Sequence, residues 1–564
     1  MGSLGVIFGG AIDLQIASLC VQGIGRFTRI SIVRNNGMSA SMAEPLSEPV
    51  DRYSSHVVGQ KMKRSLAVCA LPSFVGLCML SASALAAPTK PPEASPAALA
   101  DATQSSVPYA GPARRIAELS PQGNVSPLAT LFDPVAASEA KIFREMSSLQ
   151  VPMNVDIAEI VEAYYNQPKA KLVWVDGKGA TAKAAQALNL MKQAGDWGLT
   201  PEDYAMSATF ESLPQGSPER VKALARFEVT LSSKMLMFLQ DNFRGRIDPN
   251  QLSHYYDFKR KPVDLKATMS QLSVLPDLLP AFDRLMPGNP KFGQLAAELH
   301  YLRTSGQGPD TAADINKVIV AMEEIRWLPQ QFPQRYVFIN QPAYMAYYNE
   351  NDQTTLSMKA VIGQQDHQTN FFNASIKTVE FNPDWGVPQS IIHNEMLPHL
   401  KRDPAYLDKE GYIVSVKGKQ MPSAKVDWSQ PLENISVVQP PGPDNALGQL
   451  KILFPNAHDI YMHDTPARGK FASQDRMFSH GCVRLENPRG MAAAVLNQTV
   501  DFVSQQIAAG EKKDMPLPEQ VPVYVAYFTA WPTTDGTVEY YDDIYGRDAE
   551  TLNAMAVTTS SRTQ

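Results

Sequence analysis

Cysteine is rare in this chain, whose 564 residues contain four: Cys20, Cys69, Cys78 and Cys482. Three of the four lie before residue 87, in a region that we expect to be absent from the mature protein. The remaining chain has one cysteine and cannot form an internal disulfide. In an oxidising, exported compartment, a single thiol is a liability unless it is buried or used. The cysteine count alone therefore points to Cys482.

Excess positive charge and long apolar runs are also missing. The chain has 51 Lys and Arg against 57 Asp and Glu, whereas a nucleic-acid-binding domain normally shows a basic face. Beyond the N-terminal region, no stretch approaches the roughly 18–20 apolar residues that a membrane span needs. We therefore predict no nucleic-acid partner, and membrane contact only through an uncleaved signal.

The N-terminal region carries an export signal that starts at an internal methionine. From Met62 the sequence reads MKRSLAVCALPSFVGLCMLSASALAAPTK, with two positive residues, an apolar run and a small-residue cleavage site. This layout is typical of a secretory signal peptide, and an uncleaved anchor is the alternative. We predict a signal peptide over 62–86. Residues 1–61 are then an upstream extension that is not part of the mature protein.

The first half of the exported chain is predicted to be a tether followed by a helical domain. Residues 87–150 are rich in Pro, Ala and Ser, a composition that buries little. From there to about residue 328, apolar residues recur at helical spacing, interrupted by the strand-like run KLVWV at 171–175. The longest helix should begin at Ser217 and Pro218, a cap followed by a first-turn proline.

After Pro329 the pattern changes to short alternating runs that predict strands. These are RYVFIN (335–340), TLSMKAVIG (355–363), IKTVEFN (376–382), KILFPN (451–456), DIYMH (459–463) and VPVYVAYFTAW (521–531). One helix is predicted over 488–508. The fold class is therefore α+β, with a helical domain over 151–328, a mostly β domain over 329–548 and a tail over 549–564.

Residues 391–444 interrupt the strands without a long periodic pattern. The stretch is too long for an ordinary loop, so we predict an inserted subdomain. It lies between strands of the β domain, where a lid would shield a reactive intermediate from water. A fixed insertion is the alternative.

The candidate catalytic residues are concentrated in residues 459–488. This segment contains the groups that acyl transfer by a cysteine requires: a thiol, a base, oxyanion donors and a positive charge that binds substrate. Cys482 is the nucleophile. In a strand, Tyr461 and His463 share a face, so the candidate base lies beside a hydroxyl. Gly481 permits a sharp turn and close approach of backbone amides. Arg484 offers a fork for a carboxylate.

These residues resemble a known family. Ser479, His480, Gly481, Cys482 and Arg484, in the run SHGCVR with His463 upstream, are similar to the SHGCxR signature of YkuD-type L,D-transpeptidases. The resemblance continues in FNPDWGVP (381–388), LKRDPAYL (400–407), PGPDNALGQLKILFPN (441–456), IYMHDTP (460–466) and YFTAWPTTDGTVEYYDDIYGRD (527–548), and covers roughly 155–548. It implies a large periplasmic member with a scaffold domain and a capping subdomain.

The resemblance also implies site roles. Cys482 would be the nucleophile and His463 the base, with Tyr461 and Arg484 binding and stabilising the substrate. Trp385 matches a donor-site aromatic and is otherwise a core residue. His480 and Ser479 belong to the motif, and His480 orients the turn or moves a proton. The family's small peptidoglycan-binding module is not recognisable between Asp248 and Asp310.

The implied function is a peptidoglycan L,D-transpeptidase that forms cross-links through a thioester from a tetrapeptide stem. The same nucleophile would serve an L,D-carboxypeptidase or a protein-to-wall anchoring enzyme, and a wall-binding scaffold without activity is the alternative from another class. A zinc site from His458, His463, His480 and Cys482 is disfavoured because their spacing fits no closed structural pattern. No metal or other cofactor is therefore predicted. The sequence does not indicate the oligomeric state.

Overall fold

The computed structural model describes residues 114–115, 134–168 and 170–563. The predicted extension over 1–61, the signal peptide over 62–86 and most of the tether lie outside these ranges. Within the described ranges, no helix is both long and apolar enough to cross a membrane.

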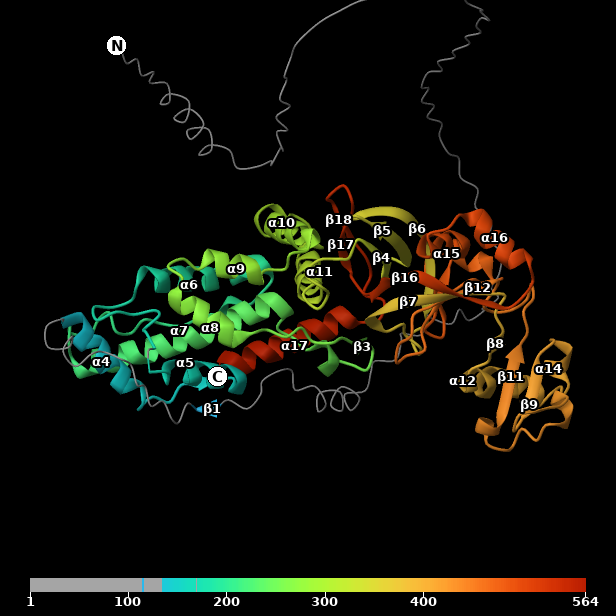
Figure 1. Cartoon of the computed structure of the whole chain (residues 1–564), viewed down its shortest axis with the longest axis horizontal. Coiled ribbons are helices and arrows are strands. Elements are labelled where there is room, and N and C mark those ends of the chain that lie inside the picture. Colours follow the sequence, from blue (N-terminus) through green and yellow to red (C-terminus); the bar gives the residue numbers. More distant parts are fainter. Residues whose placement is uncertain (1–113, 116–133, 169, 564) are drawn as a thin grey trace, which may run out of the picture. The chain divides into compact units, whose positions relative to one another are not determined.

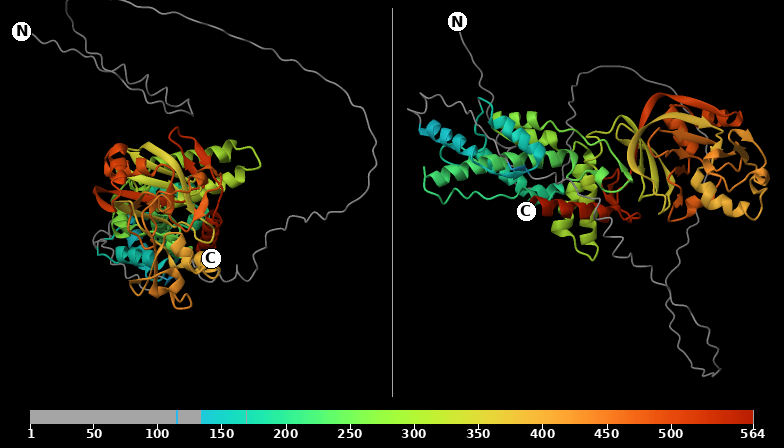
Figure 2. Two further views of the ribbon diagram at one scale, coloured as in Figure 1. Left: turned by 90° about the vertical axis from the view of Figure 1, so that its right-hand side faces the viewer. Right: turned by 90° about the horizontal axis from the view of Figure 1, so that it is seen from below.

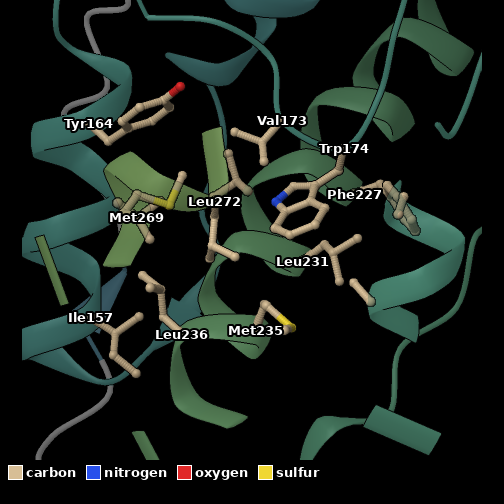
Figure 3. Packing of buried hydrophobic residues seen from close by; sticks show 14 of the residues in the cluster. Ile157, Tyr164, Val173, Trp174, Phe227, Leu231, Met235, Leu236, Met269 and Leu272 are labelled. Atoms are coloured by element: carbon tan, nitrogen blue, oxygen red, sulfur yellow. The ribbon is translucent and has the colours of Figure 1, made fainter. Parts of the chain in front are cut away.

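The helical domain is built around one long helix (Figure 1). α7 (Pro218–Arg244) begins as predicted, because the Ser217 side chain accepts a hydrogen bond from the Arg220 amide and Pro218 opens the first turn. Around it lie α5 (Val155–Tyr165), α6 (Ala182–Lys192), α8 (Leu265–Val274) and α9 (Leu279–Leu285). Their shared apolar core contains Trp174, Leu231, Met235, Met269 and Leu272 (Figure 3).

Two segments of the helical domain differ from prediction. α4 (Pro134–Met146) lies within the predicted tether, yet it packs along α7 and buries Ile142, Phe143 and Met146. KLVWV forms only an isolated bridge between Val175 and Ala180. The amides of Val173, Trp174 and Val175 instead donate to the buried carboxylate of Glu228, at 2.5, 2.9 and 2.9 Å. A side chain thus replaces the neighbouring strand.

The predicted tail is also helical. α17 (Arg547–Thr563) packs against α11 (Thr311–Glu324), which follows α10 (Pro290–Ser305). Near its end, Arg562 lies 2.9 Å from a carboxylate oxygen of Asp203 and 2.6 Å from one of Asp241. These buried ion pairs fix the last helix to the helical domain.

The β domain predicted from the alternating runs is, in the structure, a sheet that closes on itself (Figure 1, Figure 2). Its strand order is β12-β13-β15-β6-β5-β4-β16-β7-β3, β14 pairs with β6, and a further pairing of β12 with β7 closes the sheet on itself. The strands are β3 (Tyr256–Asp257), β4 (Arg335–Asn340), β5 (Met345–Glu350), β6 (Gln353–Gly363), β7 (Phe371–Phe381), β12 (Leu450–Leu453), β13 (Met462–His463), β14 (Met477–Ser479), β15 (Val483–Leu485) and β16 (Lys513–Ala526).

Two predicted elements of the β domain are split. The helix predicted over 488–508 is two helices, α15 (Pro488–Leu496) and α16 (Val500–Ala508), because Asn497 adopts a left-handed conformation with φ 54°. The last predicted run divides into β16 and β17 (Ala530–Pro532), which pairs with β18 (Val538–Tyr540).

The predicted insertion folds into a small sheet with its own core. The strands β8 (Trp385–Gly386), β9 (Ile413–Val416), β10 (Lys419–Gln420) and β11 (Ile435–Gln439) lie in the order β10-β9-β11-β8. Short helical turns cover them: α12 (Gln389–Ile391), a π-helical turn (Ile392–Met396), α13 (Leu397–Leu400) and α14 (Tyr406–Lys409). We call residues 385–439 the cap. The α+β architecture with an inserted subdomain is therefore confirmed.

Candidate active site

The nucleophile lies in a short turn between β14 and β15. Gly481 adopts a φ of 109°, which L side chains rarely adopt. The Ser479 hydroxyl donates to the carbonyl oxygen of Cys482 at 2.5 Å and accepts from the Gly481 amide at 3.2 Å. Thr369 donates its hydroxyl to the Gly481 carbonyl at 2.8 Å. Because its amide is bonded to Ser479, Gly481 shapes the turn in this structure and offers no free amide to an oxyanion.

Cys482 is half-buried, and its thiol interacts with the backbone and the hydroxyl of Tyr461. Its sulfur lies 3.7 Å from the carbonyl oxygen of Asp459. Burial raises the pKa of Cys482 to about 11, opposed by hydrogen bonds from the Tyr461 backbone and hydroxyl and by the nearby charge of Arg484. At neutral pH the resting nucleophile is therefore a thiol, and a base must remove its proton.

His463 is a neutral imidazole, and one of its two ring nitrogens already forms a hydrogen bond. The residue is 4% exposed, and Nδ1 lies 2.5 Å from the carbonyl oxygen of Asp464. A carbonyl only accepts, so Nδ1 carries the proton and Nε2 keeps its lone pair. Burial lowers the pKa of His463 to about 3, helped by the positive charge of Arg484. Nε2 therefore keeps the lone pair that a base needs, while burial lowers its basicity in the resting site.

Tyr461 contacts both predicted catalytic residues. The rings of Tyr461 and His463 meet edge to face, with centroids 5.7 Å apart, and the Tyr461 hydroxyl reaches the Cys482 sulfur. Within the described residues, no hydrogen bond joins His463 directly to Cys482.

Arg484 lies directly beside the base, because β13 and β15 run parallel with His463 paired to Arg484. Its guanidinium is half-buried, and its Nε atom has no hydrogen-bond partner within the described part of the chain. Burial lowers the pKa of Arg484, and the nearby carboxylate of Glu395 opposes that fall. A buried, incompletely bonded guanidinium next to the nucleophile is suited to bind a carboxylate.

His480 and Trp385 connect the site to the cap differently. His480 Nε2 lies 3.0 Å from Oε1 of Glu395, in the π-helical turn of the cap. Trp385 lies in β8, packed against the cap core. Among the described residues, no hydrogen bond or ring contact joins Trp385 to Cys482, His463 or Tyr461.

Several supporting residues were missed by sequence reasoning. Lys451 lies over the Tyr461 ring, 5.6 Å from its centroid, and forms a 2.5 Å ion pair with the buried Glu380. Asp464 is held by the amides of Gln449 and Thr465 and by Arg468 at 2.8 Å. None of these residues belongs to the cysteine motif, and only the folded sheet places them there.

The described residues contain no group of three or more His, Cys, Asp or Glu side chains that could hold a metal ion. His458, which the zinc alternative required, lies 3.1 Å from Asp257 instead.

Two families match separate parts of the chain. Residues 334–518 match YkuD, the L,D-transpeptidase catalytic domain, and residues 159–299 match the scaffold domain. A Haemophilus influenzae protein named "Putative L,D-transpeptidase" is 31% identical over 221 residues, which are 38% of this chain and 45% of that protein. The chain thus spans less than half the length of this curated relative.

Solved structures that resemble the chain share little sequence with it. "L,D-transpeptidase from Mycobacterium smegmatis" is 10% identical with a TM-score of 0.16, over 34% of this chain and 58% of that chain. "Structure of the Ldtfm-avibactam carbamoyl enzyme" is 9% identical with a TM-score of 0.18, over 39% and 62%. "Structure of LD transpeptidase LdtMt1 in complex with imipenem" is 12% identical with a TM-score of 0.16, over 34% and 58%.

Proposed function

The catalytic domain of this chain belongs to the YkuD family of L,D-transpeptidases, as the sequence resemblance predicted, and on that premise we propose that Cys482 forms peptidoglycan cross-links through a thioester. The observation that carries the proposal is the Cys482 turn, with the thiol against Tyr461 and next to Arg484, and with the free Nε2 of a neutral His463 nearby. The proposed acyl donor is a tetrapeptide stem.

The first half of the reaction acylates the enzyme. As the thiol attacks the carbonyl before the terminal D-Ala, its proton passes to Nε2 of His463. The new C–S bond forms, the C–N bond to D-Ala breaks, and D-Ala leaves with a proton returned from His463. Arg484 binds a carboxylate of the donor and holds it against the sulfur.

The second half transfers the acyl group to an amine. An amine of a second stem attacks the thioester, the C–S bond breaks, and Cys482 regains its proton. The acceptor is the side-chain amine of a diamino acid, giving a 3→3 link, or the amine of an N-terminal L-Ala, giving a 1→3 link. With water as acceptor the same site is an L,D-carboxypeptidase, and with a protein amine it is an anchoring enzyme.

The reaction requires an exported enzyme, because its substrate lies outside the cytoplasmic membrane. We propose a periplasmic location, supported by the signal-like sequence over 62–86. We also propose that the cap excludes water from the thioester. This proposal is supported by the contact between Glu395 of the cap and His480 in the Cys482 turn.

The test is a muropeptide assay with matched variants. The protein from residue 87 onward is incubated with tetrapeptide monomers and dimers, and products and acyl-enzyme are measured by mass spectrometry. The wild type should release D-Ala, carry the tripeptide acyl group on Cys482 and form cross-links. Cys482→Ala should lose all three while keeping the melting temperature of the wild type. Cross-linking by a folded Cys482→Ala protein, or no acylation of the wild type, would overturn the proposal.

A further inference from the structure

An ion pair joins the cap to the nucleophile's motif. Glu395 Oε1 lies 3.0 Å from Nε2 of His480, two residues before Cys482. The carboxylate is a fixed feature of the cap, because Ile392 and Met396, at the two ends of its π-helical turn, are buried in the cap core. Single π-helical turns are frequent at functional sites.

The two sides of the Cys482 turn carry opposite charge. Arg484 supplies the positive side, while Lys451 is neutralised by Glu380. Glu395 supplies negative charge close enough to affect Arg484, and its side chain is 56% exposed. Since Oε1 is bonded to His480, the second carboxylate oxygen remains for a ligand. Asp459 is a second acidic residue near the sulfur, but its side chain lies outside the cap.

The two substrates of the proposed reaction carry opposite charges, so the site needs both a positive and a negative group to bind them. The donor stem brings carboxylates, which suit Arg484. The acceptor brings a primary amine, which is an ammonium ion at neutral pH and suits a carboxylate. An ammonium ion has no lone pair, so it must lose one proton before it attacks the thioester. The second proton that the nitrogen loses, as the new amide forms and the C–S bond breaks, returns to the Cys482 sulfur.

We propose that Glu395 forms the acceptor side of the site: its carboxylate binds the acceptor's ammonium group, and its bond to His480 positions that imidazole to take the ammonium proton. This inference rests on the proposed function and adds the acceptor's chemical class. The Nε2–H of His480 donates to Glu395, which leaves Nδ1 as the proton acceptor. His480 also faces His367, with ring centroids 4.9 Å apart, and the charge of Arg484. Because His480 is 30% exposed, the accepted proton can pass to water.

The experiment compares Glu395→Gln with Glu433→Gln, an exposed glutamate elsewhere in the cap. The donor is the tetrapeptide, and the acyl-enzyme is offered either a stem amine or hydroxylamine, which is uncharged at neutral pH. Glu395→Gln should raise KM for the stem amine by about tenfold or more, the effect of losing a charge-assisted hydrogen bond. Capture by hydroxylamine should change much less, and the optimum for stem-amine transfer should move to higher pH, where the free amine is more abundant. Glu433→Gln should behave as wild type.

The outcomes separate this inference from the proposed function. If the wild type is not acylated by the tetrapeptide, the proposed function fails. If the wild type forms cross-links and Glu395→Gln keeps the wild-type KM and pH profile for the stem amine, the acceptor role of Glu395 is wrong. Equal losses with the stem amine and with hydroxylamine would show a structural role for Glu395 and would also overturn the inference.

Discussion

The Nδ1 atom of His463 lies 2.5 Å from the backbone carbonyl oxygen of its neighbour Asp464. This contact fixes the tautomer, and burial keeps the ring neutral. The nearby Cys482 keeps its proton up to about pH 11. A thiolate–imidazolium pair therefore does not form at rest, and the proton should leave the thiol during attack on the substrate.

This resting state predicts a particular pH dependence for alkylation of Cys482. A thiol reacts as thiolate, and a raised pKa keeps the thiolate fraction small until the pH approaches that pKa. The rate of iodoacetamide labelling should therefore rise about tenfold per pH unit from pH 7 to 10, without a plateau. Mass spectrometry of the Cys482 peptide measures the rate, with a short cysteine peptide as control. A plateau below pH 8 would show that a preformed ion pair exists.

Removing the base should slow the reaction strongly. His463→Ala should lower the rate of D-Ala release by about 10²–10⁴-fold, the usual range for a positioned acid–base group. The single-turnover rate of acylation is the quantity to measure, because it isolates the first half of the reaction. A loss smaller than about threefold would remove His463 from its role.

The position of Asp464 depends on a glycine. Gly448 has a φ of 61°, and a Cβ there would lie 2.5 Å from the Asp464 carboxyl group. Gly448→Ala should therefore displace Asp464 and, through its carbonyl, His463, with a loss of about 10²-fold in acylation rate. Gly442→Ala is the matched control, since nothing lies within 4 Å of its added Cβ. Equal acylation rates in the two variants would show that the position of Asp464 does not affect catalysis.

The cap can be removed where its first and last strands pair with each other. Gly386 in β8 and Val438 in β11 are direct partners in the cap sheet, so a short Gly/Ser linker can replace residues 387–437. If the cap excludes water from the thioester, the product ratio should shift from cross-link to hydrolysed tripeptide, with Cys482 still acylated. Glu395→Gln, which keeps the cap, separates lost water exclusion from lost amine binding. An excised protein that keeps the wild-type ratio would show that the acceptor stem itself excludes water.

The sequence predicted correctly those elements and contacts that depend on residues close together in the chain. RYVFIN became β4 because its aromatic and β-branched residues favour a strand, which is buried from Tyr336 to Asn340, and Ser217 with Pro218 began α7 because caps are local. Tyr461 and His463 lie together because they are two residues apart in an extended segment.

Sequence reasoning failed where a distant partner decides structure. KLVWV has the composition of a strand, but Glu228 satisfies its amides. Glu395 and Thr369 reach the Cys482 turn from other segments of the chain, and no sequence spacing predicts such contacts. The helix α4 was missed because its few buried residues follow a long polar stretch.

The helical domain is complete only after α17, the last helix of the chain, has docked on it. Arg562 follows Asp203 by 359 residues and Asp241 by 321. A buried carboxylate that lacks one of its cationic partners is costly, so the helical domain cannot reach its full stability until α17 has docked. A chain that is cut before α17 would present an unfinished domain to proteases, although all of its other helices are present. The first domain in the sequence is thus among the last to become protected.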